Sequence, residues 1–197
     1  MKSKGQLINP TGGGEQKRMK TPILETQRLL LRPMTVQDAE KAFANWTHDP
    51  DVAKFMCWKM HQNVEDTRQW LLSEEAALYS DYIYHWGFVL KETGELIGSA
   101  GLSFREEKGI YELAYNLMKK YWNKGLATEA SQAIIEFGKT TLHQTAFFGC
   151  HVKDNPASGT VLTKVGFHYE HDGEYYCDNQ ERNLETREYI LKVDNND

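Results

Sequence analysis

The chain has 197 residues, of which 26% are charged, and a formal net charge of -5 at pH 7. A chain of this length can bury a core of its own, which favours one sizeable domain. The negative balance argues against a nucleic-acid partner, because a phosphate backbone demands a basic face.

No apolar run approaches the roughly 20 residues that a membrane-spanning helix requires, and residues 1–20 lack the apolar core of a secretory signal. We therefore expect a cytoplasmic protein with no membrane partner. The cysteines, Cys57, Cys150 and Cys177, are far apart and form no CxxC pair. We expect all of them to be reduced thiols, as is usual in the cytosol.

Residues 1–22 are expected to be a disordered extension that precedes a single domain at 23–194. The extension is polar and carries Gly12-Gly13-Gly14 at its centre. No strand precedes these glycines and no periodic helix follows them, so they do not fit a nucleotide-binding loop.

The elements predicted before residue 110 are, in order, a strand at 28–32, a helix at 35–46, a helix at 63–78 and strands at 82–91 and 95–104. Pro33 ends the first strand, since proline removes a backbone donor. Thr35 and Asn63 are residue types that cap helix starts. The turn Glu92-Thr93-Gly94 joins the last two strands as a hairpin.

The stretch Ile110–Gly138 predicts a strand, a loop and a helix. Apolar side chains alternate from Tyr111 to Leu117, and helical spacing begins after Gly125. The loop therefore presents free backbone N–H groups at a helix start beside Lys124, which is a typical phosphate site. An ordinary crossover with lysines in solvent explains this stretch equally well.

The elements predicted after residue 138 are a strand at 146–152, a helix at 155–164, a strand that starts at 166–167 and a last strand at 184–193. Hairpins join the strands before residue 110, whereas the helix at 125–139 makes a crossover between parallel strands. These patterns predict a layered α+β domain.

Five segments resemble, in order, the GNAT superfamily of N-acetyltransferases, in particular its RimJ/RimL-like branch: Glu25–Pro33, Gly94–Ser99, Tyr121–Ala130, Asn155–Phe167 and Glu185–Tyr189. The resemblance covers residues 24–192. It implies a mixed, mostly antiparallel sheet of about six to seven strands with helices on both faces. The chain departs from the family at Trp122, where Gln or Arg is usual, and at Asn123, where the branch often has glycine.

The resemblance implies acetyl-CoA as co-substrate, and we expect no metal. The pyrophosphate should bind the loop residues Asn123, Lys124, Gly125, Leu126, Ala127 and Thr128. Glu129 would repel the phosphates, so its side chain should point away.

The pantetheine arm should pair with the strand near Leu117 and Met118, where the resemblance implies a bulge at Asn116–Met118 that separates this strand from the one at 146–152. Asn155 is a further candidate contact of the arm. An Asx-Pro turn explains Asn155 equally well.

The chemistry of acetyl transfer suggests three catalytic candidates. The acceptor amine must lose a proton to attack, and Glu112 is the candidate base, although a surface glutamate on an edge strand fits as well. The leaving thiolate needs a proton, for which Ser158 and then Tyr115 are candidates. Ser158 is also a typical helix-start residue.

The resemblance implies an acetyl-CoA-dependent N-acetyltransferase that acts by direct transfer in a ternary complex. The acceptor is a primary amine, and the branch points to the α-amine of a protein or peptide N-terminus, such as that of a ribosomal protein. A small amine (polyamine, amino acid or aminoglycoside) remains an alternative acceptor, and a non-catalytic acyl-CoA-binding module is the rival function. Trp58 and Trp86 are candidate walls of the acceptor pocket. For the oligomeric state, a monomer and a homodimer are both compatible with the sequence.

Overall fold

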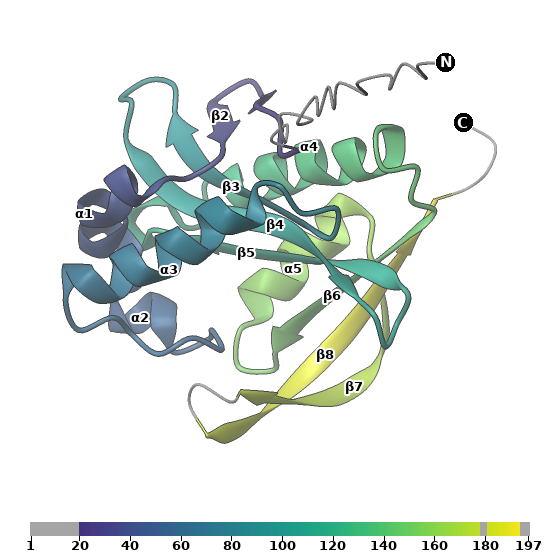
Figure 1. Cartoon of the computed structure of the whole chain (residues 1–197). Coiled ribbons are helices and arrows are strands. Elements are labelled where there is room, and N and C mark those ends of the chain that lie inside the picture. Colours follow the sequence, from purple (N-terminus) through teal and green to yellow (C-terminus); the bar gives the residue numbers. More distant parts are fainter. Residues whose placement is uncertain (1–19, 178–180, 194–197) are drawn as a thin grey trace, which may run out of the picture.

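The structure, a computed structural model, describes residues 20–177 and 181–193 (Figure 1). Its elements in chain order are β1 (Leu24–Glu25), β2 (Leu29–Arg32), η1 (Val36–Asp38), α1 (Ala39–Ala42), η2 (Phe43–Thr47), α2 (Pro50–Ala53), α3 (Val64–Ala77), β3 (Ile83–Leu90), β4 (Leu96–Arg105), β5 (Ile110–Leu117), η3 (Lys119–Tyr121), α4 (Leu126–Thr140), β6 (Ala146–Val152), α5 (Pro156–Val165), β7 (His168–Cys177) and β8 (Arg182–Lys192).

The eight described strands form one sheet in the order β1-β2-β3-β4-β5-β6-β8-β7. The β5–β6 pair is parallel, and the other pairs of this sheet are antiparallel. The predicted mixed, mostly antiparallel sheet is confirmed, with one strand more than expected. The extra strand is β1, whose two residues are too few to show an alternating pattern.

Helices cover both faces of this sheet, as predicted. On one face α4 and α5 contribute Ile134, Phe137 and Leu162 to the larger core cluster. On the other face a smaller cluster joins Trp46 with Leu71 of α3. In Figure 1, α3 crosses in front of the strands with α1 beside it, and α4 runs along the top of the molecule.

The predicted helix at 35–46 is instead broken into η1, α1 and η2, and η2 has wide π-type turns. Such turns insert an extra residue into a helix. Here the altered path buries the side chain of Trp46 completely and lets Asn45 Nδ2 donate to the carbonyl of Leu96 at 2.7 Å. The helix predicted from Asn63 is confirmed, with a reciprocal cap between Asn63 and Asp66.

Residues 20–22, which we expected in the extension, pack against the domain. The amide of Lys20 donates to Leu78 O at 2.8 Å, and Thr21 is buried. Trp86 Nε1 donates to Pro22 O at 2.6 Å. Residues 1–19 of the expected extension lie outside the described residues.

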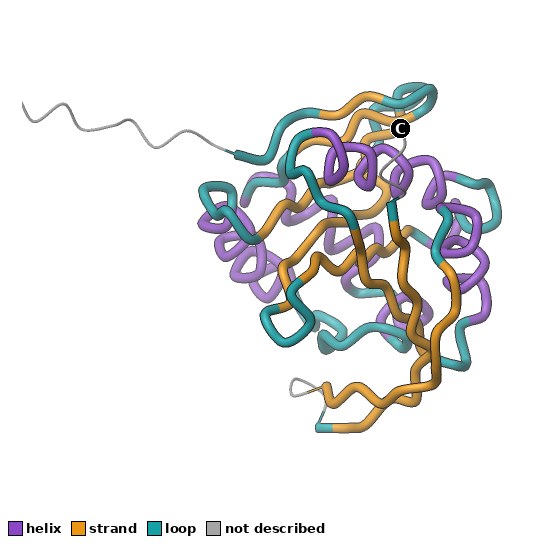
Figure 2. Tube along the Cα trace, turned by 90° about the vertical axis from the view of Figure 1, so that its right-hand side faces the viewer, coloured by secondary structure: helices purple, strands orange, loops and turns teal. Residues whose placement is uncertain are grey.

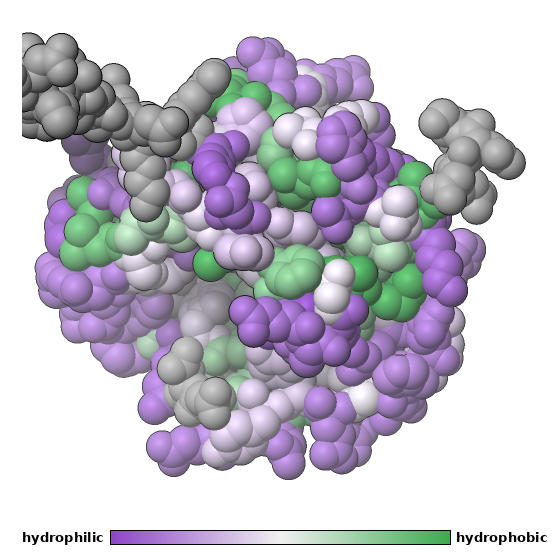
Figure 3. All heavy atoms as spheres, turned by 45° about the vertical axis from the view of Figure 1, so that its right-hand side comes forward, coloured by the Kyte–Doolittle hydropathy of each residue, from purple (hydrophilic) through white to green (hydrophobic). Residues whose placement is uncertain are grey.

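Hydrophilic side chains predominate on the face of the molecule in Figure 3, with apolar side chains in separate small groups. Within residues 20–177 and 181–193, no helix is both long and apolar enough to cross a membrane.

The β7–β8 hairpin extends beyond the rest of the sheet (Figure 2). Its first strand ends at Cys177, which forms a disulfide with Cys57 of the loop between α2 and α3. The prediction of reduced thiols is therefore wrong for these two residues, and Cys150 alone is a free thiol. The bonded residues are 120 positions apart in sequence with Cα atoms 5.0 Å apart, so only the fold brings them together.

Candidate active site

A cavity of about 570 Å³ opens where β5 and β6 diverge. Its walls come from β5, the loop before α4, the start of α5, the α2–α3 loop and the β7–β8 hairpin. Because elements from both halves of the sheet meet here, the cavity is the natural place for a ligand that bridges them.

The divergence of the two strands is visible in their register. β5 pairs with β6 only at Tyr111↔Phe147 and Glu112↔Phe148 in the described sheet. β4 and β5 stay in register from Arg105↔Ile110 to Gly98↔Leu117, so the expected bulge at 116–118 is absent. The predicted separation is nevertheless present, because each strand keeps its full pairing with its other neighbour. From Leu113 onward this edge of β5 faces the cavity instead of β6.

The loop before α4 forms a concavity of backbone N–H groups. Asn123 and Gly125 both adopt positive φ angles, 60° and 75°. The first backbone amide to bond within the helix is that of Glu129, which donates to Gly125 O, so the amides of Leu126, Ala127 and Thr128 remain without helical partners. Such a nest at a helix start binds anions. Asparagine is one of the few non-glycine residues that tolerates this backbone conformation, which explains the departure at Asn123.

Glu129 points away from this nest, as predicted, and anchors the helix to the first strands. Its carboxylate accepts hydrogen bonds from Thr26 Oγ1 at 2.6 Å and from Arg28 N and Nε at 2.7 and 2.6 Å. Partial burial raises the pKa of Glu129, but the hydrogen bonds from Thr26 and Arg28 outweigh it, so the pKa lies below its usual range.

Arg28 supports the loop of the nest from outside the cavity lining, with its guanidinium paired to Glu129, a contact that the sequence did not reveal. Its Nη1 donates to Lys124 O at 2.9 Å, and its Nη2 lies 3.6 Å from where a Cβ on Gly125 would stand. Lys124, the expected cation, does not line the cavity; its Nζ lies 5.1 Å from the centroid of the Tyr121 ring. Since Arg28 is 96 positions from Lys124 in sequence, no local sequence pattern could predict that it contacts this loop.

Of two further loop residues, Trp122 lines the cavity and Met118 does not. Trp122 Nε1 donates to Leu117 O at 2.7 Å and so ties the loop to the end of β5. The amide of Met118 donates to Ile97 O at 2.7 Å. Met118 also does not line the cavity, so the expected contact with it is not supported. The other expected cofactor residues do line the cavity: Leu117, Asn123, Gly125, Leu126, Ala127, Thr128, Asn155 and Ser158.

Tyr115 and Ser158 meet in the middle of the cavity. The phenol of Tyr115 donates to Ser158 O at 2.8 Å and lies 2.7 Å from Ser158 Oγ. Burial raises the pKa of Tyr115, and the hydrogen bond with Ser158 offsets only part of this shift. Tyr115 is therefore a phenol at neutral pH. Asn155 Oδ1 caps α5 by accepting from Ser158 N at 3.4 Å.

Glu112 closes the far end of the cavity, with 12% of its side chain exposed. The alternative of a surface glutamate is therefore wrong. Arg105 Nε donates to Glu112 Oε2 at 2.5 Å, and Arg105 Nη2 donates to the hydroxyl of Tyr175 at 3.1 Å. Cys150 Sγ donates to Glu112 Oε1 at 3.4 Å. Burial and the charge of Glu112 raise the pKa of the Cys150 thiol, so it stays protonated.

Of the two residues expected in the acceptor pocket, Trp58 lines the cavity and Trp86 does not. Trp58 lines the cavity together with Phe55 and Met56, which belong to no recognisable sequence motif. Trp86 is fully buried and packs edge-on against Phe137. Trp86 thus belongs to the core and not to the acceptor pocket expected of it.

Within the described part of the chain, no group of three or more His, Cys, Asp or Glu side chains is arranged to hold a metal ion. The cavity brings together the anion-binding nest of the loop before α4 and, from β5, the phenol of Tyr115 and the carboxylate of Glu112.

Residues 28–168 match the profile of the acetyltransferase (GNAT) domain, which covers most of the chain. The chain belongs to the GNAT acetyltransferase family. The matched range contains the nest, Tyr115, Glu112 and Ser158. It ends at the first residue of β7, so Tyr175 and Cys177 lie outside it.

This GNAT acetyltransferase is 32% identical over 151 residues to the uncharacterised N-acetyltransferase YoaA of Bacillus subtilis, a match that covers 76% of this chain and 84% of YoaA. The ribosomal-protein-S5-alanine acetyltransferase of Vibrio fischeri has a similar solved structure, with a TM-score of 0.74 and 18% identity over 88% of this chain and 98% of that one. The microcin C7 self-immunity acetyltransferase MccE, solved with acetyl-CoA and AMP, has a TM-score of 0.73 and 16% identity over 85% of this chain and 93% of MccE. At these identities the two solved structures share the fold.

Proposed function

We propose that this enzyme transfers the acetyl group of acetyl-CoA directly to a primary amine in a ternary complex, with the α-amine of a protein or peptide N-terminus as the favoured acceptor. The observation that carries the proposal is the order of groups along one cavity. Along β5 and the loop that follows it, Glu112 comes first, Tyr115 with its partner Ser158 comes next and the anion nest comes last, and all of them line one cavity.

The cofactor end supplies what acetyl-CoA needs. The N–H groups of Leu126, Ala127 and Thr128, three residues that line the cavity, suit the pyrophosphate. The unpaired edge of β5 suits the amides of the pantetheine arm, as an added strand would. A backbone N–H of the same edge can polarise the thioester carbonyl and stabilise the oxyanion of the tetrahedral intermediate.

The acceptor end supplies a base. A free amine has a pKa of about 8 to 10 and is mostly protonated at neutral pH, so its proton must be removed before attack. Glu112 lies three residues before Tyr115 on β5, which is about 10 Å of strand. Side chains three residues apart leave opposite faces of a strand, yet both line the cavity that opens where β5 separates from β6. An amine bound within hydrogen-bond reach of Glu112 can pass its proton to the carboxylate directly or through one water. Arg105 Nε donates to Glu112 Oε2 and fixes the orientation of this carboxylate.

The middle of the cavity supplies the proton that the leaving thiolate needs. Tyr115 and Ser158 share a hydrogen bond, so either hydroxyl can donate while the other replaces the proton. Cys150 is a poor nucleophile because its thiol stays protonated, which favours direct transfer over an acyl-enzyme.

Support for a protein N-terminus comes from the RimJ/RimL-like resemblance of the sequence and from the fold shared with a ribosomal-protein-S5-alanine acetyltransferase. A small amine would use the same nest, phenol and carboxylate. A non-catalytic acyl-CoA-binding module would keep the nest but transfer nothing.

The test is an acceptor screen. The protein is mixed with acetyl-CoA and a panel of peptides with free N-termini, polyamines, amino acids and aminoglycosides, and free thiol is followed with a colorimetric reagent. We expect thiol release with at least one N-terminal peptide. Release with only a small amine would overturn the favoured acceptor, and acetyl-CoA binding without release for any amine would favour the module.

A further inference from the structure

The disulfide joins two walls of the acceptor end of the cavity. Cys57 lines the cavity from the α2–α3 loop, beside Met56 and Trp58. Its partner Cys177 is buried at the end of β7, on the β7–β8 hairpin that forms the opposite wall. Breaking this bond would therefore remove the covalent link between two parts of the cavity that are distant in sequence.

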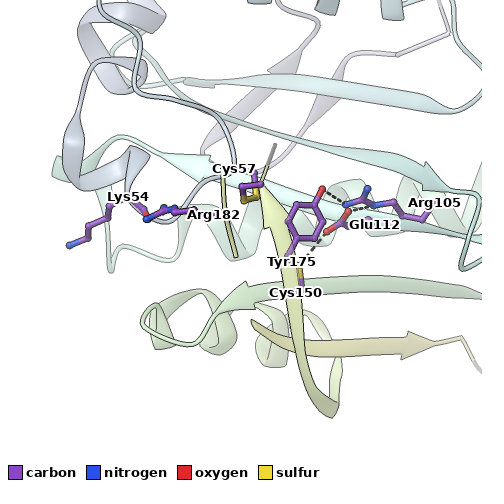
Figure 4. Close-up of a disulfide and its surroundings, with 8 residues drawn as sticks. Lys54, Cys57, Arg105, Glu112, Cys150, Tyr175 and Arg182 are labelled. Atoms are coloured by element: carbon purple, nitrogen blue, oxygen red, sulfur yellow. Dashed lines mark hydrogen bonds and ion pairs between the residues drawn. A yellow bond between two sulfur atoms is a disulfide. The ribbon is translucent and has the colours of Figure 1, made fainter. Parts of the chain in front are cut away.

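A second contact ties the same two walls together. Arg182 Nη2 donates to Lys54 O at 2.9 Å. Arg182 pairs directly with Cys177 across the hairpin, so both ties leave the hairpin at the same point. Figure 4 shows the disulfide lying between Lys54 and Arg182 on one side and Tyr175, Arg105 and Glu112 on the other.

A chain of contacts leads from the disulfide to the candidate base. Tyr175 precedes Cys177 by two residues on β7, so both side chains leave the same face of the strand. The Tyr175 hydroxyl accepts from Arg105 Nη2 at 3.1 Å, and the guanidinium lies 5.4 Å from the centroid of the tyrosine ring. Arg105 Nε in turn donates to Glu112 at 2.5 Å.

We infer that the Cys57–Cys177 disulfide is a redox-sensitive positioning device for the acceptor site, acting on Glu112 through Tyr175 and Arg105. The intact bond fixes the α2–α3 loop against the hairpin and fixes Tyr175 against Arg105. The reduced form leaves both free to move and uses the amine acceptor less efficiently. This inference rests on the proposed function for the role of Glu112 toward the acceptor.

The chemical step is thiol–disulfide exchange with a dithiol. One thiolate of the dithiol attacks Sγ of Cys57 or Cys177, and the other protein sulfur leaves as a thiolate and takes up a proton. The second thiol of the dithiol then displaces the remaining protein sulfur. The products are two protein thiols and the disulfide of the dithiol, a balanced two-electron exchange.

The effect of reduction should be local. The α2–α3 loop is still anchored at its far end, where His61 N donates to Thr47 O at 3.0 Å. β7 keeps its pairing with β8 from His168 to Cys177. The nest around Gly125 is held by Arg28 and Glu129, neither of which touches the disulfide walls. Acetyl-CoA binding should therefore survive reduction while acceptor use falls.

The test compares the oxidised protein with the same protein after treatment with a dithiol. Alkylation under denaturing conditions should count one free thiol before treatment and three after it. Acetylated product is measured by chromatography with a peptide that has a free N-terminal Ala or Ser, because the dithiol would react with a thiol reagent. We expect kcat/KM for the peptide to fall about tenfold, since small displacements of a positioned group cost this much or more. The KM for acetyl-CoA should stay within about twofold, because its site is held by other contacts.

Matched variants separate this device from a general loss of structure. The double variant Cys57→Ser with Cys177→Ser should behave like the reduced protein and should not respond to the dithiol. Tyr175→Phe should lower the rate of the oxidised protein and shrink its response to the dithiol, because the contact that transmits the effect is gone. Tyr176→Phe, one position along on the opposite, exposed face of β7, should keep the full response.

An unchanged peptide kcat/KM after full reduction would overturn the inference, as would an equal dithiol response in the double serine variant. If no amine is acetylated in either redox state, the proposed function fails. The positioning role of the disulfide is then tested by hydrogen exchange of the oxidised and reduced protein in the absence of acceptor. Faster exchange at residues 54–60 and 174–177 after reduction would support the device, and unchanged exchange there would overturn it.

Discussion

The phenol oxygen of Tyr115 lies 2.7 Å from Oγ of Ser158, which joins β5 to the first turn of α5 across the cavity. The arrangement depends on both residues. The phenol stays protonated because burial raises its pKa, and Ser158 provides both a hydroxyl and a carbonyl for it.

Tyr115→Phe is expected to lower kcat by about 100-fold, which is typical for the loss of a general acid. Acetyl-CoA affinity should change little, because the nest is untouched. The measurements are steady-state rates and calorimetric titration with acetyl-CoA.

Ser158→Ala should reduce kcat through the same step. The variant that combines Tyr115→Phe with Ser158→Ala should have a kcat within about twofold of the slower single variant. The effects of residues that act as a unit are not additive. Fully additive losses would contradict a shared role in proton delivery.

Glu112→Gln is expected to lower turnover most at low pH. There the acceptor amine, with an ordinary pKa of about 8 for an α-amine, is almost entirely protonated and depends most on a base. As pH rises the amine loses its proton to solvent and the difference from wild type should shrink. The measurement is the pH dependence of kcat/KM for the acceptor.

The matched control is Glu188→Gln on β8, whose carboxylate bonds Lys108 and is absent from the described cavity lining. This control should keep the wild-type profile. A wild-type profile in Glu112→Gln as well would remove Glu112 from the mechanism.

Gly125→Glu is expected to abolish acetyl-CoA binding. The substitution places a side chain at a φ of 75° and a negative charge within the nest. Gly125→Ala is the control, because it imposes a strain of about 1 kcal/mol without the charge. We expect calorimetry to detect weakened binding for alanine and none for glutamate. Equal affinity of wild type and Gly125→Glu would refute the assignment of the loop.

Asp38→Asn is expected to destabilise the fold by about 2 kcal/mol, the usual effect of losing hydrogen bonds to a buried charge. The Asp38 carboxylate accepts hydrogen bonds from the Arg32 guanidinium at 2.7 and 2.8 Å and from the backbone amide of Thr35 at 3.0 Å. Burial raises the pKa of Asp38, but the bonds from Arg32 and Thr35 outweigh this and bring it below its ordinary value.

A lowered folded-state pKa means that Asp38 contributes its stability above the unfolded value of about 3.9, and that this contribution is lost as pH falls through the folded pKa. Urea unfolding should therefore separate wild type from Asp38→Asn at pH 7 and bring them together in acid. Asp81→Asn is the control, because its ion pair with Lys20 is exposed and such pairs contribute about 0 to 1 kcal/mol. A loss for Asp38→Asn as small as that of the control would contradict this role.

Features set by local sequence were the ones that could be predicted. The stripe from Leu126 to Phe137 fixed the buried face of α4, and the pair Asn63 and Asp66 fixed the start of α3. The nest was predictable for the same reason, because a glycine before an apolar helical stripe is visible within a few residues.

Contacts between distant segments could not be predicted in this way. The link from Cys57 to Cys177, the approach of Arg28 to the nest and the network of Glu112 with Arg105 and Tyr175 depend on how strands far apart in sequence are placed. Trp86 illustrates the same limit, since an aromatic side chain on a strand can face a pocket or the core, and only packing decides which.

The most direct test of the central claim is to follow an isotopically labelled acetyl group. The protein is incubated with labelled acetyl-CoA and an N-terminal peptide, and mass spectrometry measures the label on the peptide α-amine while chromatography measures free CoA. We expect one labelled peptide for each CoA released by the wild type, and neither product from Gly125→Glu. Release of CoA without labelled amine, or label retained on the protein, would contradict direct transfer to an amine in this cavity.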